Sequence, residues 1–155
     1  MFALMLTLLL QSGSLEGTLQ VPPGTPPPAN ARVVLLPLEY AKRFNALTQL
    51  RLDEYWEVFK ASGMAHRNKE FFIRYMPYAY STVLENVVSE MRREGINTAN
   101  LIKTAPGGEF QFNNIAPGEY KLVATASLRG EDNVWSATIQ VPSSRLVVQV
   151  KYRVP

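Results

Sequence analysis

The chain has 155 residues, 46% of them hydrophobic and 19% charged, which is the composition of a globular domain rather than a disordered chain. Its net charge is +3, and no basic run is longer than a pair such as Arg92-Arg93, so the clustered positive charge typical of nucleic-acid binders is missing. The absence of cysteine excludes thiol catalysis, thiolate metal sites and disulfides. We therefore expect one domain with no nucleic-acid partner.

The N-terminus carries an apolar run from Phe2 to Leu10, far shorter than the roughly 20 residues that span a bilayer. This run is typical of the apolar part of a signal peptide, and Ser12 and Ser14 supply small residues for a cut after Ser14. We expect residues 1–14 to be a signal peptide and the mature domain, 15–155, to be exported to the periplasm, cell surface or medium. No Lys or Arg precedes the run, which leaves open a first strand or short helix packed on the core.

Two strands are expected next. Leu15–Val21 alternates apolar and polar residues, which predicts a half-buried strand. Pro22–Asn30 contains five prolines in nine residues and predicts a stiff surface loop, because proline fixes φ and removes ladder donors. Ala31–Leu36 is a short apolar run that predicts a strand buried on both sides.

The spacing of the apolar residues then changes to the 3.6-residue period of helices. This pattern predicts that residues 39–95 form a helical hairpin inserted between the second and third strands. The first helix has its apolar stripe at Ala41, Phe44, Leu47, Leu50 or Arg51, Tyr55, Trp56 and Phe59. The second begins at Asn68, ends at Arg93, and has its stripe at Phe72, Met76, Ala79 or Tyr80, Val83, Val87 and Met91. Pro77 should kink this helix or divide it.

From Gly107 onward the period returns to two. Alternation predicts strands at Glu109–Asn113, Tyr120–Ser127, Val134–Val141 and Leu146–Val154. The tetrapeptide Ala116–Glu119 has the chemistry of a type II turn, with proline second and glycine third. About six strands separated by turns predict a β-sandwich, so the fold class is mainly β with a helical insertion (α+β).

Residues that could carry chemistry are few. His66 is the only histidine and lies in the expected turn between helices, so a metal site or a serine triad lacks partners. No phosphate-binding glycine loop and no nucleophile elbow is present. The clustered carboxylates lie on a helix face and a polar loop where water solvates them: Asp53, Glu54, Glu57, Glu131 and Asp132. We expect no enzyme activity, no metal and no cofactor.

The most unusual feature is the aromatic content of the hairpin. Six aromatic residues of the hairpin form a candidate partner or ligand surface: Tyr55, Trp56, Phe59, Phe71, Tyr75 and Tyr78. They could hold the helices together and to the sheet, dock a protein, or lie against a membrane surface. Trp56, Trp135 or several tyrosines could instead stack on sugar rings if they lie coplanar on one surface.

Residues 108–124 resemble a family signature. GEFQFNNIAPGEYKLVA is similar to the G-x-F-x-F-x-x-(apolar)-x-P-G-x-Y-x-L-x-A pattern of carboxypeptidase regulatory-like domains, which are transthyretin-like, and collagen-binding adhesin B-type domains look similar. The resemblance covers residues 15–37 and 107–155 and implies a prealbumin-like antiparallel Greek-key β-sandwich, with Pro117, Gly118 and Tyr120 at the fold-determining turn. Residues 38–106 depart from the family, since a helical insertion there is atypical.

The resemblance implies a noncatalytic module, because such domains accompany peptidases, receptors and surface proteins. We expect an exported binding or structural module that contacts a protein partner, the cell envelope or a second copy through its helical insertion. The alternative is a carbohydrate-binding module that recognises a polysaccharide. An enzyme would need carboxylates converging in a cleft around His66 or Glu57.

Overall fold

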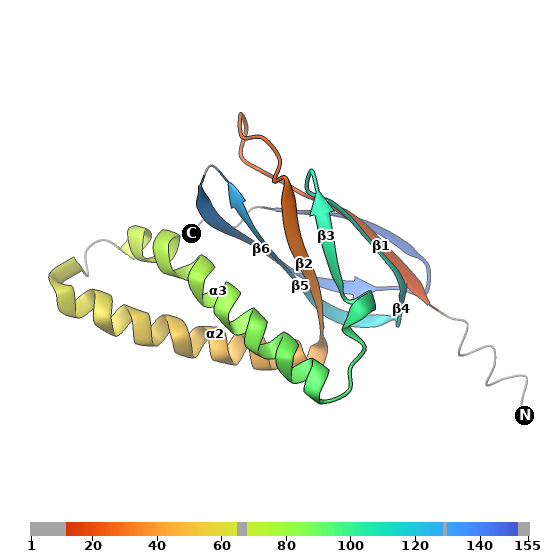
Figure 1. Cartoon of the computed structure of the whole chain (residues 1–155), viewed down its shortest axis with the longest axis horizontal. Coiled ribbons are helices and arrows are strands. Elements are labelled where there is room, and N and C mark those ends of the chain that lie inside the picture. The colour runs from red at the N-terminus through yellow and green to blue at the C-terminus, as the bar shows by residue number, and fades with distance from the viewer. Residues whose placement is uncertain (1–11, 65–67, 129, 152–155) are drawn as a thin grey trace, which may run out of the picture.

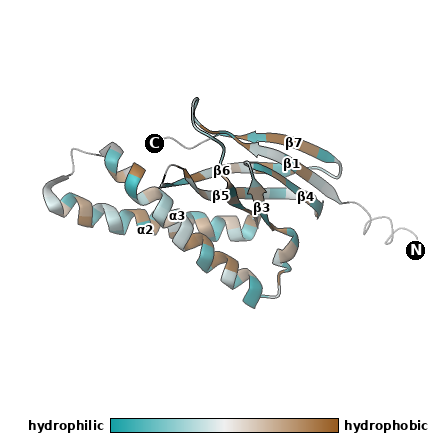
Figure 2. Ribbon diagram, turned by 45° about the horizontal axis from the view of Figure 1, so that its top comes forward, coloured by the Kyte–Doolittle hydropathy of each residue, from teal (hydrophilic) through white to brown (hydrophobic). Residues whose placement is uncertain are grey.

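The computed structural model describes residues 12–64, 68–128 and 130–151, which form two β-sheets and a helical hairpin. The hairpin lies against one of the two sheets, so the molecule has three layers (Figures 1 and 2). The elements in chain order are β1 (Gly13–Leu19), β2 (Asn30–Pro37), α2 (Leu38–Phe59), η1 (Lys60–Met64), α3 (Asn68–Arg93), η2 (Thr98–Asn100), β3 (Ile102–Pro106), β4 (Glu109–Ile115), β5 (Gly118–Leu128), β6 (Glu131–Val141) and β7 (Arg145–Val150).

One sheet has the strand order β4-β1-β7 and the other β3-β2-β5-β6. β1 pairs antiparallel with β4 and parallel with β7, whereas all pairs in the second sheet are antiparallel. Within the described residues the chain changes sheet at β1–β2, β3–β4, β4–β5 and β6–β7. The protein is therefore a mixed α+β fold made mostly of strands in two sheets, with two long helices between β2 and β3 in the chain.

The main core lies between the sheets, where alternation along each strand turns one apolar face inward. Leu15 of β1 and Phe112 of β4 are paired and fully buried. In the other sheet Leu35 pairs with Leu122, and Trp135 lies on β6 with no exposed surface. The indole N–H of Trp135 donates to the backbone oxygen of Gln20 at 2.8 Å, which links the end of β1 to the second sheet.

The hairpin covers the outer face of the β3-β2-β5-β6 sheet. Arg32 of β2 forms an ion pair with Glu85 of α3, and Lys121 of β5 donates to the Asn45 side chain of α2 at 2.7 Å. Buried residues of both helices join the main core here: Tyr40, Ala41, Phe44, Tyr80, Val83, Leu84, Val87, Val88 and Met91. The other end of the hairpin projects past the strands (Figure 1).

α3 ends in a Schellman motif. The N–H of Ile96 donates to the Met91 carbonyl at 2.9 Å and that of Gly95 to the Arg92 carbonyl at 3.2 Å. Gly95 has a φ of 83°, a left-handed conformation that glycine adopts without steric cost. This motif stops α3 at the position that the sequence predicts and turns the chain toward β3.

α3 runs through Pro77 as one helix, so of the two expected effects of this proline, a kink or a division, the division is wrong. Proline inside a helix removes one hydrogen bond and costs about 3 kcal/mol. Phe71 before it and Tyr80 after it are both buried, and Pro77 is buried as well. Packing on either side of the proline therefore outweighs the lost bond.

The predicted stripe of α2 is wrong at its centre. Leu47 and Leu50 are 38% and 55% exposed, whereas Thr48 is only 5% exposed. The inward face of α2 runs from Tyr40 and Phe44 to Thr48, so a threonine stands where the apolar pattern favours a leucine. A prediction from hydropathy alone places Leu47 on the buried face, because leucines are more often buried than threonines.

Two further expectations need correction. The sequence pattern does not reveal β3, which has one buried residue, Ala105, and therefore no visible alternation. Gly118 has a φ of 150° rather than the roughly +80° of a type II turn, so the expected type II turn is instead a bend at Pro117 that leads into β5. The hydroxyl of Tyr120 donates to the Ala116 carbonyl at 2.7 Å and holds this bend closed.

The expected signal peptide lies mostly outside the described residues, which begin at Ser12. Gly13 and Ser14 belong to β1, and the N–H of Ser14 donates to the Ser144 carbonyl at 3.0 Å. A cut after Ser14 would therefore remove two residues of this strand.

Candidate functional site

The six aromatic residues named from the sequence come together in the projecting half of the hairpin. We call Tyr55, Trp56, Phe59, Phe71, Tyr75 and Tyr78 the tip cluster. Neighbouring ring centroids in it are 5.1 to 6.1 Å apart, within the usual range for aromatic pairs. Its buried members, Phe59 and Phe71, lie outside the main core, so the tip cluster is a second, smaller core.

The tip cluster divides into an inner and an outer part. Phe59 and Phe71 are 6% and 1% exposed and lie between the helices, where they hold the hairpin together. The other members are half-buried, except Tyr78, which is 58% exposed. The same half of the hairpin also exposes three aliphatic side chains: Leu50, Val58 and Ile73. The surface available to a partner is thus aromatic and aliphatic, with Tyr78 as its most exposed ring.

The three tyrosines of this surface do not form a flat platform for sugars. The Tyr55 ring is tilted by 37° to Tyr75 and by 42° to Tyr78, so the three rings are not coplanar. Trp135 is fully buried between the sheets, so the suggestion that it stacks on a sugar is wrong. Its alternating position on β6 faces the core, where its N–H already has a partner.

At the opposite, sheet-bound end of the hairpin, ion pairs and hydrogen bonds join α2 to the end of α3. The guanidinium of Arg43 on α2 donates to the Glu90 carboxylate at 2.6 Å and to the Glu94 carboxylate at 3.0 Å. The Tyr40 hydroxyl also donates to Glu94, and this bond together with burial raises the pKa of Tyr40 to about 12. Hydrogen bonds from Tyr40 and then Arg43 hold the pKa of Glu94 below its ordinary value. These groups close the hairpin onto itself at its base.

The carboxylates considered for catalysis do not converge. Glu57 forms an ion pair with Lys60 at 3.0 Å, Glu54 one with Arg51 at 3.2 Å, and Asp53 accepts from Gln49 at 2.8 Å, all along the surface of α2. His66 lies outside the described residues. Within residues 12–64, 68–128 and 130–151, no group of three or more His, Cys, Asp or Glu side chains could hold a metal ion.

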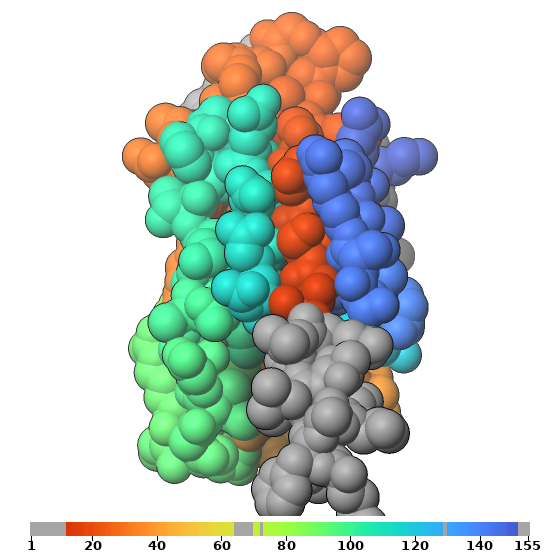
Figure 3. All heavy atoms as spheres, turned by 90° about the vertical axis from the view of Figure 1, so that its right-hand side faces the viewer, coloured from red at the N-terminus to blue at the C-terminus, as the bar shows by residue number. Residues whose placement is uncertain are grey.

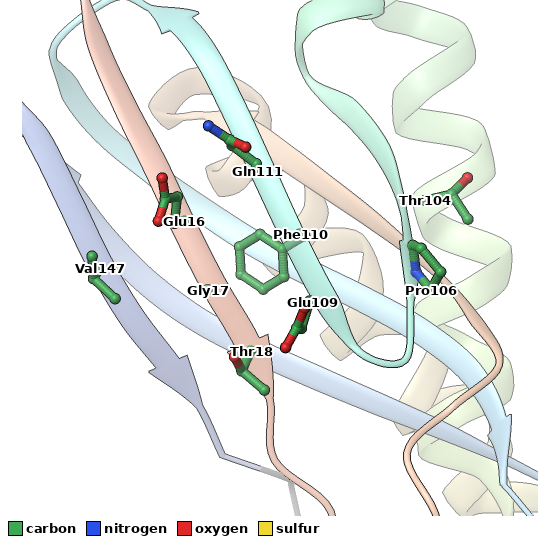
Figure 4. Close-up of a pocket in the computed structure, with 9 residues that line it drawn as sticks. All are labelled: Glu16, Gly17, Thr18, Thr104, Pro106, Glu109, Phe110, Gln111 and Val147. Atoms are coloured by element: carbon green, nitrogen blue, oxygen red, sulfur yellow. The ribbon is translucent and has the colours of Figure 1, made fainter.

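The structure adds a hollow that the sequence did not indicate, on the outer face of the β4-β1-β7 sheet (Figure 3). It has a volume of about 530 Å³, and Glu16, Thr18, Glu109, Gln111 and Val147 are among the side chains around it (Figure 4). Glu16 is already paired with Arg145 at 2.5 Å. The hollow is a shallow polar surface on exposed strand faces rather than an enclosed site.

A second cavity, of about 400 Å³, lies where α2, α3 and β5 meet. Its walls are Asn45, Thr48, Gln49, Leu52, Met76, Tyr80 and Lys121. One feature of the sequence could have indicated this cavity. Thr48 follows Tyr40 and Phe44 at a spacing of four residues, so a polar residue stands on the buried face of α2, where apolar residues are usual.

No protein-family profile and no curated protein matches this chain. Among solved structures, the pilus backbone protein RrgB from Streptococcus pneumoniae is similar over 90% of this chain, with 11% sequence identity and a TM-score of 0.32. The match covers 41% of the RrgB chain, so this protein spans about two fifths of that length. Within the described residues, neither long helix combines the length and apolar content that a bilayer span requires.

Proposed function

We propose that this protein is a noncatalytic module in which a β-sandwich presents a helical hairpin, and that the hairpin tip binds a partner protein. The observation that carries the proposal is the position of the tip cluster, which projects past the sheets with Tyr78, Val58 and Ile73 exposed beside buried rings. The rest of the hairpin already has its partner in the sheet. Most of the large apolar side chains that the hairpin exposes lie in this projecting half: Leu50, Val58, Ile73 and Tyr78.

The chemistry of the tip suits a protein better than a polysaccharide. Aromatic residues over an apolar centre with charged residues around it are typical of protein interfaces. Here the exposed pairs Arg51–Glu54 and Glu57–Lys60 supply such a charged border along α2. A sugar platform built from several tyrosines would need coplanar rings, and Tyr55 is tilted to both Tyr75 and Tyr78.

We also propose that the two sheets form a prealbumin-like Greek-key sandwich, as in carboxypeptidase regulatory-like domains. The support is the hairpin-connected pair β5–β6, the β2–β5 pairing and the repeated passage of the chain between sheets. We also propose export through residues 1–14. N-terminal sequencing of the mature protein would test this, and an intact Met1 in the purified native protein would refute it.

Photo-crosslinking in the native cell tests partner binding at the tip. A photoreactive phenylalanine analogue replaces Tyr78 in one variant and Val147 of β7 in the control; these two side chains are 58% and 64% exposed. We expect one adduct of constant mass from position 78 and none from position 147. Equal labelling at both positions, or retention on polysaccharide without a protein adduct, would contradict the proposal.

A further inference from the structure

We propose that the partner of the hairpin is a second copy of this chain, bound antiparallel along α2. This inference rests on the proposed function, because it names the protein that covers the tip. Its starting point is a row of residues on α2 that we call the α2 stripe: Leu47, Arg51, Glu54 and Val58. At about 100° of rotation per residue, the four lie within about 60° of one another around the helix axis. They therefore form one side of the helix.

The α2 stripe is open to solvent. Its two apolar residues, Leu47 and Val58, are 38% and 71% exposed. The side chains of Arg51 and Glu54 between them are 44% and 52% exposed. The stripe is separate from the buried face of α2, and it runs from the projecting tip toward the sheet-bound half of the helix. The contact that we propose therefore extends from the tip along α2, with the charged pair at its middle.

The order of the α2 stripe is complementary to its own reverse. From the N-terminus it is apolar, positive, negative and apolar, at successive spacings of four, three and four residues. An antiparallel copy related by a two-fold axis places Leu47 against Val58 of the second copy. In the same register it places Arg51 against Glu54 of the second copy. A two-fold axis repeats each contact, so the whole stripe is matched when these two pairs are.

The charges select both the orientation and the occupant. A parallel copy would place Arg51 beside Arg51 and Glu54 beside Glu54, and such like-charge contacts are unfavourable. Within one chain Arg51 and Glu54 already pair at 3.2 Å, but an exposed pair of this kind contributes little. In the antiparallel contact each guanidinium gains a second carboxylate. An unrelated protein would have to supply this pattern, whereas a second copy supplies it by symmetry.

The size of the contact sets the expected affinity. The α2 stripe spans about 16 Å along the helix, at a rise of about 1.5 Å per residue. Leu50, which is 55% exposed, lies beside the stripe and adds apolar surface to the contact. An interface of one helix against another is at the small end of the range for proteins. We therefore expect a dissociation constant on the order of 10–100 µM.

Sedimentation equilibrium of the full chain, from about 1 µM to about 1 mM, tests the dimer. Arg51→Glu places glutamate against Glu54 of the second copy and should raise the dissociation constant at least about tenfold. Glu54→Arg should have the same effect, because it places two arginines together. An equimolar mixture of the two variants should dimerise again, since each position 51 then faces the opposite charge at position 54.

The mixture separates the contact between chains from the ion pair within each chain. It restores opposite charges across the interface, although neither variant regains its own Arg51–Glu54 pair. The matched control is Lys60→Glu, which reverses the charge of one member of the exposed Glu57–Lys60 pair on the same helix. Position 60 lies about 150° around the helix from the stripe, so the dissociation constant should not change. Circular dichroism spectra should show that each variant is folded.

Three results would each overturn the dimer: a strict monomer at the highest concentration, a dimer that Arg51→Glu does not weaken, or variants that do not associate when mixed. The adduct at position 78 separates this inference from the proposed function. We expect its mass to be that of two chains, because Tyr78 lies beside Tyr55 of α2, with ring centroids 5.8 Å apart. An adduct with a different protein would refute the second copy as the partner but leave partner binding at the tip standing.

Discussion

Truncation of Phe71 to alanine should unfold the tip of the hairpin and leave the sandwich folded. Phe71 is 1% exposed, and its ring centroid lies 5.1 Å from Trp56, 5.3 Å from Phe59 and 5.1 Å from Tyr75. Removal of a fully buried phenylalanine costs about 3–5 kcal/mol. Because the tip cluster is separate from the main core, this loss should fall on the tip alone.

The matched variant is Phe44→Ala, which removes an equally buried phenylalanine from the main core. Hydrogen exchange measured by mass spectrometry should show amides in residues 55–63 and 70–78 exchanging roughly a hundredfold faster in Phe71→Ala. The urea midpoint of the sandwich should change little in Phe71→Ala and fall sharply in Phe44→Ala. If both variants lower this midpoint equally, with uniform exchange across the chain, the separation of the two cores is refuted.

Two further predictions concern the base of the hairpin and the core. Because its folded-state pKa is lowered, Glu94 stabilises the fold above its ordinary pKa of 4.5, and this contribution is lost as pH falls through the folded-state pKa. Thermal unfolding at a series of acidic pH values should therefore show a smaller loss of stability on acidification in Glu94→Gln than in the wild type; an unchanged profile would contradict the role of Glu94. Trp135→Phe should lower the free energy of unfolding by about 2–3 kcal/mol in urea titrations, because it leaves the Gln20 carbonyl unpaired and opens a void. A loss below about 0.5 kcal/mol would count against this bond.

Much of the strand pattern was predictable, because a strand with one buried face shows its alternation locally. β1, β5 and β6 lie within a few residues of the expected ranges for this reason. β3 was not predicted, because a strand with one buried residue shows no alternation. On α2, whether Leu47 or Thr48 is buried depends on how the helix packs against β5 and α3. The periodicity of a single helix carries no information about that packing.

The candidate sites were predictable to different degrees. The tip cluster could be named because its residues are close in sequence and of one chemical kind. Which of its rings are buried could not, since both helices carry aromatic residues on more than one side. The cavity depends on Lys121 meeting Asn45, 76 residues away in the chain, and no local pattern records such a contact.

The position of β1 in its sheet has a consequence for the order of folding. Glu16 lies between Gln111 of β4 and Val147 of β7, so both neighbours of this early strand come from late in the chain. The inserted hairpin lies in the loop that must close before β1 can pair, whereas β5 and β6 are joined directly and can pair early. Such long-range pairing slows folding. The β4-β1-β7 sheet should therefore form last, after the hairpin and β5–β6, and only once Arg145–Val150 has been made.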